Sequence, residues 1–102
     1  MTLLPEEIRE RITPKYSTDE QGEEAQAVVK FFTDASNWTW YVTEFDGKDT
    51  FFGLVIGLEV ELGYFNLTAL ESVGQAISRD LYFEPKSIKE LKAFYAEKGY
   101  AY

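Results

Sequence analysis

Apolar residues alternate with other residues between Tyr41 and Leu62, which is the pattern of β-strands with one buried face. An Asp-Gly pair at 46–47 interrupts the alternation, and this pair favours a tight hairpin turn because both turn residues need a positive φ. The pattern therefore predicts two antiparallel strands around 46–47, the second running to Leu62. The residues expected on the buried face are Tyr41, Thr43, Phe45, Phe52, Leu54, Ile56, Leu58, Val60 and Leu62.

The opposite face holds both tryptophans of the chain, Trp38 and Trp40, together with Val42, Phe51, Gly53, Val55 and Gly57. A two-residue loop sets Trp40 opposite Gly53, whereas a wider loop sets Trp40 opposite Val55 and Trp38 opposite Gly57. A glycine in a strand leaves a gap that a neighbouring ring can cover, so we expect the indoles to lie across Gly53 and Gly57. This face is either a small core under the N-terminal helix or an exposed aromatic platform for a partner.

Helical periodicity occurs at both ends of the chain. Leu4, Ile8 and Ile12 form one apolar stripe, and Thr13-Pro14 should end that helix. Near the C-terminus, Ser87 and Glu90 have the spacing of a capping box. The helix that they open should run to about Lys98, end at Gly99 and bury one stripe, formed by Ile88, Leu91, Phe94 and Tyr95.

The remaining segments complete the predicted topology. Residues 15–24 are polar and acidic and predict a surface loop. Val- and Phe-rich residues 25–33 predict the first strand, and 79–85 predict the fourth. Asn66 is a plausible N-cap for a short middle helix. The fold class expected for residues 1–102 is a single α+β domain, with an antiparallel sheet of about four strands and N-terminal, middle and C-terminal helices.

Charge limits the possible partners. The chain has 18 acidic and 10 basic residues, a net charge of −8, so direct binding to a phosphate backbone is not expected. The acidic excess serves either solubility or docking on a basic protein that handles nucleic acid. The N-terminus lacks the pattern of a signal peptide, and no apolar run is long enough to span a bilayer, so we expect a cytoplasmic protein.

Catalytic chemistry has few candidate residues. The chain contains no His and no Cys, which excludes His-dependent bases and the usual zinc ligands. Carboxylates alone could hold Mg²⁺, either at Glu59 and Glu61 or at the hairpin turn around Glu44, Asp46 and Asp49. Such a metal-dependent hydrolase is the least favoured alternative, and we expect neither a cofactor nor an enzyme.

Several stretches of the chain resemble a bacterial family of small proteins classed as domain of unknown function 2958. The resemblance extends from Leu3 to about Leu91, and its most specific parts are "NWTWY", "DTFFGLV" and "ELGYF". Members tend to be encoded on plasmids, phages and integrative elements, often near antirestriction and conjugation genes. The resemblance implies an accessory or counter-defence protein of a mobile element, and it supplies no catalytic or binding residues.

Together these features favour a non-enzymatic interaction protein that inhibits a host nuclease, of the anti-restriction or anti-CRISPR type. Carboxylates would stand in for phosphates in a basic channel, and the tryptophans would be apolar anchors. The alternative is a small-molecule binding module in which the aromatic patch forms the floor of a pocket. The first strand is a possible edge for pairing with a second copy. The residues expected at the partner site are Trp38, Trp40, Glu20, Glu23, Glu24, Glu44, Glu59 and Glu61.

Overall fold

The computed structural model describes residues 4, 6–10, 12–14, 22–33, 38–57, 59–72 and 77–99. Five strands lie in the order β6-β5-β4-β3-β7, and a sixth, β1, pairs with β4 in parallel. A separate two-stranded sheet joins β2 to β8. The strands are β1 (Thr13–Pro14), β2 (Gln26–Ala27), β3 (Val29–Thr33), β4 (Thr39–Phe45), β5 (Thr50–Ile56), β6 (Val60–Asn66), β7 (Ile77–Arg79) and β8 (Lys86–Ser87). The helices are α1 (Glu6–Arg9), the 3₁₀ turn η1 (Gly22–Glu24), α2 (Leu67–Ser72) and α3 (Ile88–Glu97).

This architecture is mostly β, so the predicted α+β class with about four strands and three flanking helices is wrong. The N-terminal helix extends only over Glu6–Arg9, although Leu4 and Ile12 of its predicted stripe are buried. The predicted first strand divides at Val28 into β2 and β3, which pair with different partners. Only η1 of the predicted acidic loop is described, since residues 15–21 lie outside the described part of the chain.

The hairpin predicted around Asp46-Gly47 is present, with Gly47 at a φ of 88°. Its wider register is the observed one, since Trp40 pairs with Val55. The Asp46 carboxylate accepts hydrogen bonds from the backbone N–H groups of Lys48, Asp49 and Thr50, and this closes the turn. A β-bulge between Val42 and Glu44 inserts one residue into β4, so Phe45 moves to the face opposite the one predicted.

The long strand predicted to reach Leu62 folds back on itself instead. The chain turns between Ile56 and Val60, and β6 returns antiparallel to β5, pairing Leu54 with Leu62 and Val55 with Glu61. The Gly57 N–H donates a 3.0 Å hydrogen bond to the Glu59 carbonyl, which closes this second hairpin. Leu62 consequently reaches the sheet edge, where it is 41% exposed rather than buried.

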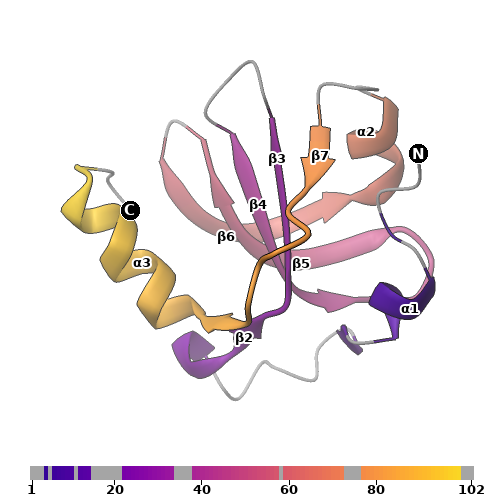
Figure 1. Cartoon of the computed structure of the whole chain (residues 1–102), viewed down its shortest axis with the longest axis horizontal. Helices are drawn as coiled ribbons and strands as arrows, with labels where there is room; N and C mark the ends of the chain where they lie inside the picture. Colours follow the sequence, from indigo (N-terminus) through magenta and orange to yellow (C-terminus); the bar gives the residue numbers. More distant parts are fainter. Residues whose placement is uncertain are drawn as a thin grey trace.

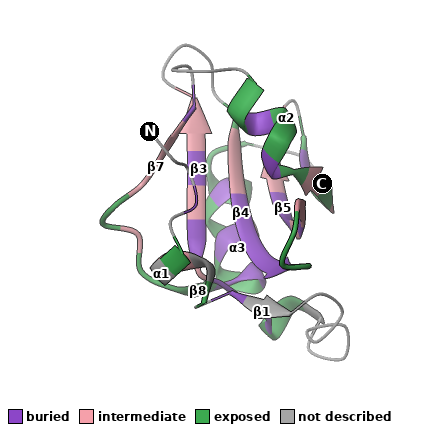
Figure 2. Ribbon diagram, turned by 90° about the vertical axis from the view of Figure 1, so that its right-hand side faces the viewer, coloured by how far each residue is buried: buried purple, intermediate pink, exposed green. Residues whose placement is uncertain are grey.

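Two apolar cores lie on the two faces of the sheet. Figure 1 shows α3 on one side and α1 and α2 on the other. Phe31, Val42 and Phe51 pack with Leu67 and Leu70 of α2 in the first core. Tyr41, Leu54 and Ile56 pack with Leu91 and Tyr95 of α3 in the second. In Figure 2 buried residues run along β3 and β4. The strands β4 and β5 contribute residues to both cores.

Local structure at α3 agrees with the sequence, while the preceding segment differs. The Ser87 Oγ accepts a 3.1 Å hydrogen bond from Glu90 N, the capping box is complete, and Gly99 has a φ of 92° just beyond the helix. Phe94, however, is 50% exposed rather than part of the buried stripe. The predicted fourth strand at 79–85 is wrong, because β7 ends at Arg79 and the Asp80 carboxylate accepts the Tyr82 N–H in a turn.

Candidate functional site

The two tryptophans lie on the α1–α2 side of the sheet with their rings stacked. Their ring centroids are 6.1 Å apart and the ring planes are inclined by 27°. Trp40 packs against the first core, whereas Trp38 is 41% exposed. The face is therefore neither fully covered nor a two-ring platform, since Trp40 belongs to the core and Trp38 to the surface.

Gly57 determines where the Trp38 indole lies. A Cβ atom built on Gly57 would be 2.5 Å from Trp38 Cη2 and Cζ3, so a glycine here allows the indole to rest on the β5–β6 turn. The predicted cover of Gly57 by an indole is confirmed. The equivalent prediction for Gly53 is wrong, because the atom nearest to its missing side chain is the backbone carbonyl oxygen of Tyr41.

The same turn brings two carboxylates to the indole. Trp38, Val55, Gly57, Glu59 and Glu61 line a hollow of about 290 Å³, called the tryptophan hollow below. Val55 pairs with Trp40 on one side and with Glu61 on the other, which places all three on one face. Glu59 and Glu61 are exposed. Glu59 and Glu61, two of the acids expected at the partner site, thus lie beside Trp38, through the fold-back of β6 rather than by continuation of β5.

The other predicted acidic residues do not join this hollow. Glu44 is 1% exposed, since the bulge turns it into the interior, and a surface contact through it is excluded. Glu23 and Glu24 lie in η1, which contacts α3 on the other side of the sheet. Lys92 donates a 2.7 Å hydrogen bond to Glu23, and this bond lowers the pKa of the Glu23 carboxyl. Glu20 lies outside the described residues.

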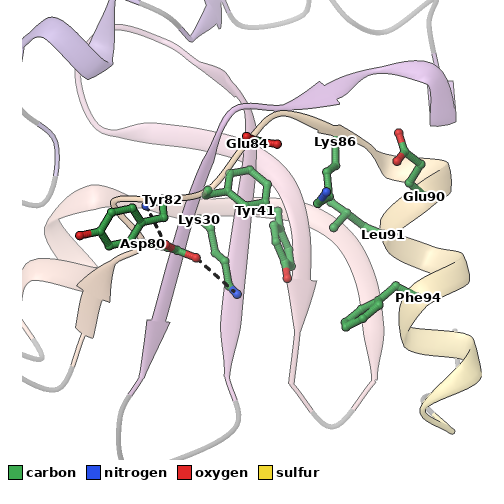
Figure 3. A pocket seen from close by; sticks show the side chains of 10 residues that line it. Lys30, Tyr41, Asp80, Tyr82, Glu84, Lys86, Glu90, Leu91 and Phe94 are labelled. Atoms are coloured by element: carbon green, nitrogen blue, oxygen red, sulfur yellow. Dashed lines mark hydrogen bonds and ion pairs between the residues drawn. The ribbon is translucent and has the colours of Figure 1, made fainter.

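A second and larger hollow, of about 450 Å³, lies on the α3 side and was missed by the sequence analysis (Figure 3). It is called the tyrosine pocket below. Its walls come from β3, β4, the segment after β7 and the first turns of α3. The lining residues are Lys30, Tyr41, Asp80, Tyr82, Phe83, Glu84, Lys86, Glu90, Leu91 and Phe94. The sequence held one signal for this pocket, because Lys30 is a single charge inside the apolar run "AVVKFF".

A buried hydroxyl pair lies next to this pocket. The hydroxyls of Tyr41 and Tyr95 are 2.6 Å apart and join β4 to α3. Burial raises the pKa of the Tyr41 hydroxyl above its usual range, and the hydrogen bond with Tyr95 adds to the rise. Tyr41 is therefore a protonated, fixed part of the wall rather than a proton-transfer group at neutral pH.

The acidic residues of the metal site predicted at the hairpin turn are buried or already engaged, Glu44 in the interior and Asp46 and Asp49 in hydrogen bonds. Asp46 accepts three backbone N–H groups in its turn. Asp49 accepts 2.7 Å hydrogen bonds from both Thr68 N and Thr68 Oγ1, and these lower the pKa of its carboxyl. Within the described residues, no group of three or more acidic side chains is arranged to hold a metal ion.

These features define a small, mostly β protein with two surface hollows on opposite faces of one sheet. A family model described as "Protein of unknown function (DUF2958)" matches residues 3–99, so the chain belongs to this family. No curated protein and no solved structure matches the chain. None of the described helices is long and apolar enough to cross a membrane.

Proposed function

We propose that this protein is a non-enzymatic interaction module that captures a basic side chain of a partner protein in the tryptophan hollow. The observation that carries the proposal is the fold-back at Gly57, which brings Glu59 and Glu61 to a half-exposed indole. An indole face with carboxylates beside it is complementary to an arginine or lysine side chain.

Two physical effects favour a cation in this hollow. A guanidinium or ammonium over a tryptophan face gains about 0.5–1 kcal/mol at an exposed site and more when water is excluded. Either carboxylate can add a charge-assisted hydrogen bond, and arginine can form two at once. Tryptophan is also a frequent centre of binding energy at protein interfaces, where a few buried anchors dominate.

The class of partner follows from the charge and the family context. A net charge of −8 attracts basic surfaces over long range and speeds association with them. Proteins that handle nucleic acid have such surfaces. Because the resemblance described above implies a mobile-element setting, we propose a host nuclease or another nucleic-acid-handling complex as the partner, with inhibition as the outcome. The protein would act in the cytoplasm and without a cofactor.

A defined peptide tests the hollow directly. Titrating Gly-Arg-Gly should change the Trp38 emission, and the uncharged peptide Gly-Gln-Gly should not. The double variant Glu59→Gln/Glu61→Gln should weaken peptide binding about tenfold, because it removes charge while preserving shape. Glu71→Gln is the matched control, since Glu71 is exposed on α2 and does not line the hollow.

The partner is then sought with the same variants. Tagged protein, Trp38→Ala and Tyr82→Ala should be compared as baits in a host lysate, since Tyr82 is an exposed ring outside the tryptophan hollow. A nucleic-acid-handling protein held by the wild type and Tyr82→Ala but lost by Trp38→Ala would support the proposal. Equal response to both peptides, or unchanged capture by every variant, would overturn it.

A further inference from the structure

We propose that the tyrosine pocket binds a planar ring bearing one anionic group, either a carboxylate or a phosphate. The pocket lies across the sheet from the tryptophan hollow and shares none of its residues, so this inference is independent of the function proposed above. Its volume of about 450 Å³ is within the range of small-molecule sites in proteins.

Aromatic side chains supply the surface for a ring. Tyr41 and Phe83 lie with ring centroids 5.5 Å apart and planes inclined by 50°. Phe94 projects from α3 toward the same space and is 50% exposed (Figure 3). A planar ligand that covers Phe83 and Phe94 would bury apolar surface that the free protein leaves in water, and it would make the offset or edge contacts that aromatic rings prefer.

Two ammonium groups flank this surface. The Lys30 Nζ lies 5.8 Å from the Tyr41 ring centroid and 3.8 Å from Asp80 Oδ2. That separation is too long for a hydrogen bond, so the ammonium keeps donors for another acceptor. Lys86 points toward the rings from the opposite side, and it has no ion pair among the described residues (Figure 3). An anionic group held over the rings would lie between these two amines.

The three carboxylates of the pocket do not cancel its preference for an anionic ligand. Asp80 accepts the Tyr82 N–H through one oxygen and pairs with Lys30 through the other. Glu90 accepts the Ser87 N–H and Oγ–H groups in the capping box. Glu84 is exposed to water, where its charge is screened. A cationic ligand would also compete with Lys30, which already lies near the face of Tyr41.

Calorimetric titration with four probes tests the chemistry of the ligand. Benzoate and adenosine 5′-monophosphate carry a ring with an anion, whereas benzamide and adenosine are their neutral counterparts. We expect at least one anionic probe to bind about tenfold more tightly than its neutral counterpart. Binding of benzoate alone identifies an aromatic carboxylate, and binding of the monophosphate alone identifies a nucleotide. Absence of binding by both anions, or equal binding of the neutral probes, would overturn the proposal.

Variants locate the site. Lys30→Met and Lys86→Met should each weaken the anionic probe about tenfold, because each removes one amine while keeping the side-chain length. Lys48→Met, at the exposed β4–β5 turn, is the matched control. Lys86 is itself exposed, so its variant remains informative if Lys30→Met does not fold. Full affinity in Lys86→Met would contradict the assignment. Trp38→Ala should leave probe binding unchanged, which separates this site from the tryptophan hollow.

Discussion

At the scale of single residues, two glycines of β5 and its turn have different roles. Gly53 lies against the Tyr41 carbonyl of β4, so the missing side chain allows two backbones to approach at the bulge. Gly57 lies under the half-exposed indole of Trp38, whose ring atoms are the nearest neighbours of its missing side chain. The first glycine serves the fold, and the second positions the side chain of the tryptophan hollow.

Alanine at these two positions should therefore separate stability from binding. Gly53→Ala should lower the free energy of unfolding by about 3 kcal/mol, because a backbone strand must move. Gly57→Ala should cost about 1 kcal/mol or less, because only the Trp38 side chain must turn away, yet it should shift the Trp emission and weaken Gly-Arg-Gly binding. Urea unfolding and peptide titration measure the two effects. Equal losses of stability would contradict this division of roles.

At the scale of elements, the N-terminus of α2 is capped by a residue of the β4–β5 turn. Asn66, the predicted N-cap, does not accept the bond that starts this helix. The Asp49 carboxylate of the β4–β5 turn accepts from Thr68 N and Thr68 Oγ1, and the Asp49 carbonyl accepts from Leu67 N at 2.8 Å. The carboxylate also lies near the positive end of the helix. The turn and the helix thus stabilise each other at the adjoining ends of β5 and β6.

This contact predicts a dependence of stability on pH. The folded pKa of Asp49 is lowered, so its stabilising effect is complete above the unfolded value of about 3.9 and is lost as the pH falls through the folded pKa. Asp49→Asn should lower the melting temperature at pH 7, and the difference from wild type should shrink below about pH 4, because Asp49 is then protonated in the unfolded chain while it is still ionised in the folded one. Glu71→Gln, on the surface of α2, is the control. A difference that is constant with pH would contradict the role of the charge.

Sequence patterns predicted elements well where one local rule decides the structure. The β4–β5 hairpin depends on a turn glycine, and α3 depends on a capping box. Both signals are formed by residues that are close together in the sequence. The fold-back after Ile56 was missed because the alternation of apolar residues continues through the turn, and the bulge at β4 was missed because one inserted residue leaves no mark in the pattern. Trp38, Glu59 and Glu61 nevertheless line one hollow, whereas the bulge buries Glu44.

At the scale of the whole molecule, the hydroxyl pair of Tyr41 and Tyr95 connects residues that are 54 positions apart. It lies within the second core and joins the centre of the sheet to the last helix. Because both hydroxyls are buried, removing one leaves the other without this partner in a medium of low polarity. The attachment of α3 to the sheet consequently combines apolar packing with this specific polar contact.

Removing the hydroxyls one at a time and together measures this contact. Tyr41→Phe and Tyr95→Phe should each lower the free energy of unfolding by about 1–2 kcal/mol, and the double variant should cost less than the sum. Chemical denaturation of the four proteins gives the coupling energy. Additive losses would show that the two hydroxyls do not act on each other. Tyr82→Phe is the control, because Tyr82 is 91% exposed.

The placement of the sheet between two cores has an evolutionary consequence. Substitutions that reshape the surface around Trp38 change side chains on one face of β4 and β5, and those around Tyr41 change side chains on the other. Distant sites without common neighbours accumulate changes nearly independently. Under the two proposals made above, selection on the partner of one face can therefore remodel that face of the chain while the ligand preference of the opposite face is kept.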